Sequence, residues 1–272
     1  MIDAHNHLQQ IEGLPEVGSW DDFNRELGID LSVVNGTGPE DWEQVFTLCQ
    51  GQKTLFPCVG FHPWKIEEKT SLDEGMVALE KALLRPPDAA TGPRVGIGET
   101  GLDRWKNPDA LPWQEPFFRE QIRLARKFEL PLTVHCLKAW GALEKIIREE
   151  RLPDRGFLLH AFGGAAENLD FWLKKGAFFS FSSCFVGPSY QRHRKVFQQI
   201  PVDRILLETD APAMAPPDER VLHRLPPQKN PQAKNHPANL ELAAESLREI
   251  TGLSLLEVKK ITTQNAQRLY TP

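Results

Sequence analysis

Short apolar runs alternate with longer amphipathic segments along the whole chain. The short runs are rich in Val, Ile, Leu and Phe and are bounded by turn-forming residues, a pattern typical of buried β-strands. We expect strands at residues 1–7, 30–36, 55–62, 94–100, 130–136, 156–162, 177–183 and 204–210.

The segments between and after these strands predict helices. Apolar residues recur at three- and four-residue spacing in 39–50, 116–128 and 139–150, and Pro39 suits a first helical position. Two more helices are expected over 237–252 and 254–270, and we expect the second to close the fold at its end. The first unit is weaker, because residues 11–28 offer only a short helix candidate.

Strands separated by helices favour parallel pairing with right-handed crossovers. Eight such units that close on themselves form an α/β fold of the (β/α)8 TIM-barrel type, and the alternative is an open doubly wound sheet. We favour the barrel, as one domain over residues 1–272. Two loops stand out: 85–93, a surface connection, and 212–237, which is long, rich in proline and follows the last strand.

Composition narrows the class of protein. With 40% hydrophobic and 25% charged residues, no bilayer-spanning apolar run and no secretion signal, the chain predicts a cytoplasmic protein without a membrane partner. Four widely spaced cysteines without a Cys-x-x-Cys pair indicate reduced thiols. A net charge of −5 excludes a broad basic surface for duplex DNA, although bound divalent cations would add positive charge.

Residues of metal-ligand type gather where the predicted strands end. Asp3, His5 and His7 alternate along the first strand and therefore share one face. Five of the eight histidines and two acids fall at strand ends: His5, His7, His62, Glu99, His135, His160 and Asp210. Carboxyl ends of barrel strands meet at one mouth, so this set predicts a metal centre for divalent ions such as Zn, Mn or Mg.

More than four ligands indicates two divalent metal ions. His5, His7 and Asp210 suit one ion, His135 and His160 the other, and Glu99 a bridge between them. No lysine at a strand end offers a carboxylated bridge instead. A water between the ions would be the nucleophile, and Asp210 is the candidate to accept its proton.

Other polar residues would support this centre. Glu208 lies two positions before Asp210 and is expected to orient a ligand, while Asp103 and Asp3 are either similar supports or ordinary cap acids. His62 is needed by neither ion, so we assign it to the substrate phosphate or the leaving group, against the alternative of a structural hydrogen bond.

Eight segments, in order, resemble the signature segments of the TatD family of metal-dependent deoxyribonucleases. They are DAHNHL, GFHPW (60–64), GETGLD (98–103), PLTVHC (131–136), HAFGG (160–164), ETDAP (208–212), NHPANL (235–240) and NAQRLY (265–270). The resemblance covers essentially the whole chain. It implies an amidohydrolase-like TIM barrel, a binuclear metal centre and hydrolysis of DNA from the 3′ end, and it carries His5, His7, Glu99, His135, His160 and Asp210 over as ligands.

The chain departs from the family pattern in HAFGG, where cysteine and serine are common, and at His236, where an acid is common. The 212–237 segment is also unlike that of a compact member. These departures bear on substrate choice.

Substrate contacts are predicted from rim residues. Arg104, Lys138 and Trp64 are the main candidates; further cations and exposed rings are Arg192, Arg220, Arg224, Lys229, Lys234, Trp105 and Trp140. Such contacts favour single-stranded DNA or frayed ends over intact duplex. Two alternatives remain open: a metal-dependent amide or ester hydrolase, and a non-catalytic barrel stabilised by metal.

Overall fold

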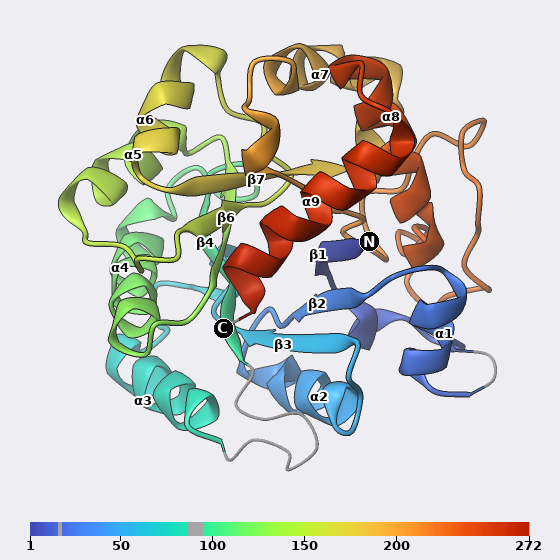
Figure 1. The fold of residues 1–272 in the computed structure, drawn as a ribbon. Coiled ribbons are helices and arrows are strands. Elements are labelled where there is room, and N and C mark those ends of the chain that lie inside the picture. The colour runs from blue at the N-terminus through green and yellow to red at the C-terminus, as the bar shows by residue number, and fades with distance from the viewer. Residues whose placement is uncertain (16–17, 86–94, 272) are drawn as a thin grey trace.

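A computed structural model describes residues 1–15, 18–85 and 95–271, and it shows a closed barrel of eight parallel strands in sequence order (Figure 1). The strands are β1 (Ile2–Asn6), β2 (Leu31–Asn35), β3 (Leu55–Val59), β4 (Gly96–Asp103), β5 (Leu132–Leu137), β6 (Phe157–Leu159), β7 (Ala177–Ser182) and β8 (Ile205–Glu208). Pairing of Asp3 in β1 with Leu207 in β8 closes the barrel. The TIM-barrel prediction is confirmed.

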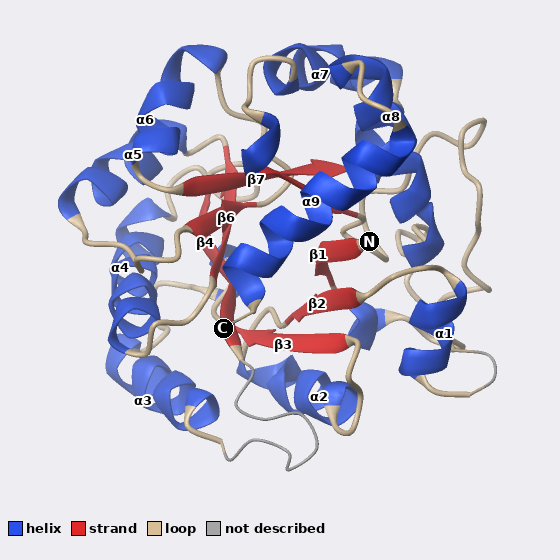
Figure 2. Ribbon diagram, in the orientation of Figure 1, coloured by secondary structure: helices blue, strands red, loops and turns tan. Residues whose placement is uncertain are grey.

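Helices surround the strands (Figure 2). They are α1 (Trp20–Glu26), α2 (Pro39–Cys49), α3 (Leu72–Leu83), α4 (Leu111–Lys127), α5 (Trp140–Glu149), α6 (Leu169–Lys174), α7 (Gln191–Phe197), α8 (Leu240–Thr251) and α9 (Leu255–Tyr270). In the described part of the weak first unit, the α-helix is the short α1, as expected. Among the described residues, no helix is both long and apolar enough to cross a bilayer.

The strand boundaries differ from prediction chiefly at β4. We expected this strand over 94–100 with Glu99 at its end, but β4 continues to Asp103 because Thr100 to Asp103 pair with Val134 to Leu137 of β5. Glu99 therefore lies inside the strand. Several other strands end earlier than expected, so that His7, His62, His160 and Asp210 stand just beyond them.

The C-terminal helix α9 packs across the end of the barrel opposite the ligand-bearing loops (Figure 1). Ala266, Leu269 and Tyr270 join one buried apolar cluster with residues near the starts of strands, among them Ile2 and Leu31. The Tyr270 hydroxyl donates to the Ala4 carbonyl at 3.2 Å and contacts the Thr133 hydroxyl at 3.1 Å. Pairing of the end strands closes the barrel, and α9 covers its base.

The two predicted loops have different outcomes. Segment 85–93 falls outside the described residues except at Arg85. Segment 212–237 runs beside the end of β8, where the Asn235 amide donates to the Thr209 carbonyl at 2.7 Å. The Asn239 amide in turn donates to Asn235 at 3.0 Å and accepts the backbone N–H groups of Leu222 and His223. The side chains of Asn235 and Asn239 thus form hydrogen bonds with backbone groups that would be paired with a neighbouring strand if they lay in a sheet.

Candidate metal centre

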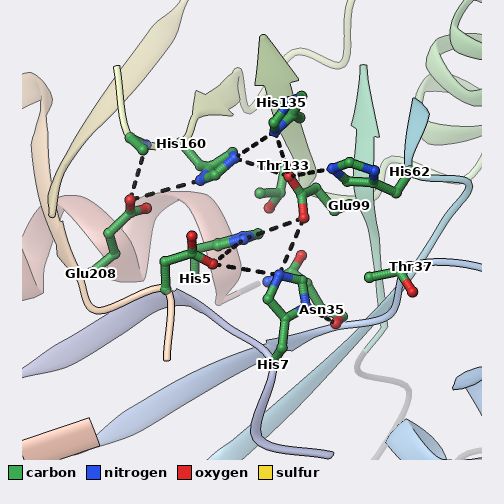
Figure 3. A network of polar contacts seen from close by, with 12 residues as sticks. His5, His7, Asn35, Thr37, His62, Glu99, Thr133, His135, His160 and Glu208 are labelled. Carbon is green, nitrogen blue, oxygen red and sulfur yellow. Dashed lines mark hydrogen bonds and ion pairs between the residues drawn. The ribbon is translucent and has the colours of Figure 1, made fainter. Parts of the chain in front are cut away.

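Glu99 lies at the centre of a buried cluster at the carboxyl ends of the strands (Figure 3). Its Oε1 is 2.9 Å from His135 Nδ1 and 2.9 Å from His160 Nε2. Its Oε2 is 3.2 Å from His7 Nε2 and 3.5 Å from His5 Nε2. One carboxylate therefore faces two histidine pairs, each through a different oxygen.

Asp210 completes the side of the cluster that holds His5 and His7. Its Oδ1 lies 3.5 Å from the Nε2 atoms of both rings. Asp210 has a φ of +56°, in the left-handed region that is uncommon for residues with a side chain. The backbone there is held because Asp210 N–H donates to the His5 carbonyl and His7 N–H to the Ala211 carbonyl. The junction of β8 with β1 thus fixes this carboxylate against strand 1.

Gly98 shows why the backbone of β4 comes so close to its neighbours. A Cβ atom at this position would stand 2.4 Å from Asn35 Oδ1 and 2.9 Å from Thr133 Cβ. A side chain here would collide with the Asn35 side chain and displace β4 from β5, and the Glu99 carboxylate would move with it. The glycine before Glu99 is required by the packing of the site.

Each of four histidines turns one ring nitrogen toward the two carboxylates. The opposite nitrogen is hydrogen-bonded in two of them: His7 Nδ1 donates to the Asn35 carbonyl at 2.7 Å, and His135 Nε2 to Asp103 Oδ2 at 2.8 Å. His160 Nδ1 lies 3.7 Å from Glu208 Oε1. This is the arrangement of metal-ligating histidines, whose second nitrogen is fixed by a carbonyl or carboxylate.

His5 gives the clearest sign that these residues fit a cation. The ring is fully buried, and neither of its nitrogens has a hydrogen-bond partner among the described residues. Leaving such atoms unpaired in a protein interior costs about 1–3 kcal/mol each, so the site is built for an additional group. The ligand atoms of His5, His7 and Asp210 lie within 4.8 Å of one another, as do those of His5, Glu99 and His160. The donor set fits a divalent cation.

His62 also faces Glu99, with its Nε2 at 3.4 Å from Oε1, but its orientation differs from that of the other rings. Its Nδ1 accepts the backbone N–H of Trp64 at 3.0 Å, so the proton of the neutral ring is on Nε2. Nε2 is then a donor without a free lone pair. Although His62, Glu99 and His135 also form a compact group, this hydrogen bond separates His62 from the metal-binding set.

Burial and charge shift the pKa values in opposite directions within the cluster. Burial opposes the charged form of His7, yet its contacts with Glu99 and Asp210 outweigh burial and raise its pKa to about 9. Burial likewise opposes charge on His160, whose pKa is nevertheless raised well above its usual value by Glu99 and Glu208. For His62 burial prevails and lowers the pKa to about 4. Burial raises the pKa of Glu99 but the surrounding histidines hold it well below its usual range.

The acids predicted as supports lie around the ligands. Glu208 is fully buried, accepts the Ala161 N–H at 2.9 Å and the Ser180 hydroxyl, and faces His160. Asp103 holds His135. Asp3 instead binds the Thr209 hydroxyl and N–H, and burial raises its pKa to about 7 in spite of these bonds.

Some of the predicted substrate residues lie near His62, and others lie in ion pairs elsewhere on the surface. Trp64 and Trp105 are exposed near His62, and Arg104 and Lys138 are exposed on adjoining loops. Arg224 forms an ion pair with Asp218, and Lys229 forms one with Glu12; both acids lie outside the Glu99 cluster. Trp140, also predicted as a ring that could stack a base, is half-buried and packs edge-on against Phe162 and Trp172 as the first residue of α5.

Comparison with known proteins adds to this geometry. The family model of TatD related DNase matches residues 2–271. The sequence is 32% identical to the uncharacterized metal-dependent hydrolase YcfH of Escherichia coli, over 99% of this chain and 95% of that relative. It is 26% identical to human deoxyribonuclease TATDN3 over 99% of this chain and 94% of the relative. The crystal structure of the TatD homologue YjjV from Escherichia coli has a TM-score of 0.84 at 24% identity, covering 100% of this chain and 98% of that one.

Proposed function

The chain belongs to the TatD related DNase family of metal-dependent hydrolases, and from this premise we propose that it cleaves DNA phosphodiesters from the 3′ end of single-stranded or frayed DNA. The observation that carries the proposal is the convergence of four histidine nitrogens on the Glu99 and Asp210 carboxylates. The deoxyribonuclease name of the human relative supports DNA as the substrate.

We propose two cation positions in this cluster. His5, His7 and Asp210 would hold one divalent cation, and His135 and His160 the other. Glu99 would join them, because its two oxygens face the two groups separately. Bound divalent cations at such a centre lower the pKa of water and neutralise charge on the phosphate oxygens.

The protein side chains then have distinct tasks. Asp210 stays ionised, since its contacts with His5 and His7 outweigh burial and lower its pKa, so its carboxylate can accept the proton of the attacking water. His62 is neutral and presents Nε2–H, which suits donation to a phosphate oxygen or to the departing oxygen. Glu208 and Asp103 position His160 and His135, respectively.

Outside the buried centre, the exposed Arg104 and Lys138 are proposed to attract the phosphate backbone. Trp64 borders His62 with ring centroids 5.0 Å apart and is the predicted apolar contact. Since the net charge of the chain is −5, this local patch would act on a strand end, where few phosphates need to be neutralised.

The test is digestion of 3′-labelled single-stranded DNA by protein supplied with Mg²⁺, Mn²⁺ or Zn²⁺, beside Glu99→Ala and the exposed control Glu68→Ala. We expect mononucleotide release by the wild type and by Glu68→Ala, and loss of about 100-fold or more in Glu99→Ala. Hydrolysis of amides or lactones with no action on DNA would assign the centre to carbonyl substrates. A metal-loaded protein inert toward all of these would indicate a binding barrel.

A further inference from the structure

Two tryptophan rings stand exposed together at the rim of the metal centre. Trp64 is 43% exposed and Trp105 is 56% exposed, although indole side chains this large are usually mostly covered. Their ring centroids lie 6.2 Å apart with an angle of 37° between the planes. The two rings therefore form one aromatic patch that is partly open to solvent.

This patch borders the reacting groups directly. The Trp64 ring centroid lies 5.0 Å from that of His62 and 6.3 Å from that of His135. A group stacked on the patch would therefore lie next to the side chains of the candidate metal centre. No such adjacency is needed for packing, since exposed rings contribute little to the core.

Positive charge accompanies the two rings. Lys106 Nζ lies over the Trp64 ring at 4.9 Å from its centroid. Arg104 N–H donates to the Leu137 carbonyl at 2.9 Å, which places Arg104 beside the turn that carries Lys138. Aromatic faces interleaved with cations are the features that bind single-stranded nucleic acid, the rings through the bases and the cations through the backbone.

The patch is tied to the metal centre through Asp103. One oxygen of this carboxylate accepts the N–H groups of Trp105 at 2.7 Å and Lys106 at 3.1 Å, and the other accepts from His135 Nε2 at 2.8 Å. A single carboxylate thus fixes the loop that carries Trp105 relative to a candidate metal ligand. The loop with Trp105 and the candidate metal centre are therefore fixed relative to each other.

We propose that Trp64 and Trp105 form a stacking platform for an unpaired nucleobase next to the scissile phosphate, and that this platform selects single-stranded ends. The inference rests on the proposed action on DNA and adds the residues that set strand preference. A paired base is already stacked between its neighbours and cannot reach these rings, whereas an unpaired base gains a stacking partner.

The experiment measures stacking apart from cleavage. The Mn²⁺-loaded protein is titrated into a single strand that carries 2-aminopurine at its 3′ end and methylphosphonates at the last two linkages, which resist hydrolysis. Stacking on indole quenches 2-aminopurine emission, so the titration reports both affinity and contact. The variants are Trp64→Leu, Trp105→Leu and Trp105→Phe, with Leu256→Ala as an exposed apolar control on α9, across the barrel.

We expect quenching by the wild type, and binding weakened about 5- to 150-fold with loss of quenching in Trp64→Leu and Trp105→Leu. Trp105→Phe should retain most of the quenching because it keeps an aromatic face, and Leu256→Ala should behave as the wild type. Manganese content, measured in each variant, confirms that the centre is intact.

Equal affinity and quenching in the wild type and both leucine variants, or no quenching by the wild type, would overturn the platform. Cleavage of an unmodified strand by the same preparations separates this outcome from failure of the proposed function. Active wild type with an unaffected Trp105→Leu removes the platform and leaves the nuclease. Inactive wild type removes the nuclease, whatever the quenching shows.

Discussion

Replacement of Asp103 by asparagine should weaken one cation position and leave the other unchanged. The Asp103 carboxylate accepts from His135 Nε2 on one oxygen and from two backbone N–H groups on the other. In Asp103→Asn the amide oxygen can still accept the backbone groups, but the amide N–H2 then faces the ring N–H of His135. The amide N–H2 and the ring N–H are both donors and would repel each other. If the introduced amide flips, its N–H2 instead faces the backbone N–H groups of Trp105 and Lys106.

The magnitude follows from the bond that is lost. A hydrogen bond to a charged group contributes about 1.5–3 kcal/mol, and loss of such a partner of a metal-ligating histidine typically lowers metal affinity 10–100-fold. His135 must also change tautomer, which puts a proton on the Nδ1 that faces Glu99. We expect the Kd at the position of His135 and His160 to rise about 10–100-fold, with little change at that of His5, His7 and Asp210.

The assay is calorimetric titration of Zn²⁺ or Mn²⁺ into metal-free protein, which should show two binding steps. Asp109→Asn makes the same acid-to-amide change at an exposed site on the same loop and is the matched control. Two unchanged steps in Asp103→Asn would refute the role given to this carboxylate. Equal weakening of both steps would refute the partition of the ligands into two groups.

Two further predictions concern protons and stability. Metal loading at pH 7.5 should release protons, and metal affinity should fall as pH is lowered, because contacts with Glu99 raise the pKa of His7 to about 9 and His7 must lose its proton to bind a cation. Calorimetry in buffers of different ionisation enthalpy measures the proton release. Metal loading without proton release would contradict the raised pKa of His7. Tyr270→Phe should lower the free energy of unfolding by about 1 kcal/mol, since it leaves the Ala4 carbonyl and the Thr133 hydroxyl without the Tyr270 hydroxyl as partner. Urea denaturation measures this free energy, and an unchanged midpoint would show that the Tyr270 hydroxyl contributes nothing to stability.

The sequence predicts the barrel because eight short apolar runs alternate with amphipathic segments, and six of the eight runs end in or just before a ligand-type residue. It also predicts that the candidate ligand residues gather at one mouth, and they do, since parallel strands present the same end. The extent of β4 could not be predicted, because pairing with β5 continues past Glu99 through residues that look like a loop. Local pattern alone does not encode such tertiary pairing.

Finer features of the site depend on contacts between distant segments. The orientation of His62 is set by the Trp64 backbone N–H, which a sequence pattern cannot reveal although the two residues are neighbours. Trp140 follows a strand-end motif much as Trp64 does, but it is half-buried because α5 turns its first residue toward Phe162. Asp103 is distinguished from a simple cap only by its bond to His135, 32 residues away.

Electron paramagnetic resonance of the protein loaded with Mn²⁺ tests whether Glu99 joins two cations. Two ions bridged by one carboxylate should give an exchange-coupled dinuclear spectrum, with two manganese ions per chain by elemental analysis. In Glu99→Gln the coupling should disappear. The isolated six-line signal of uncoupled manganese in the fully loaded wild type would contradict the account.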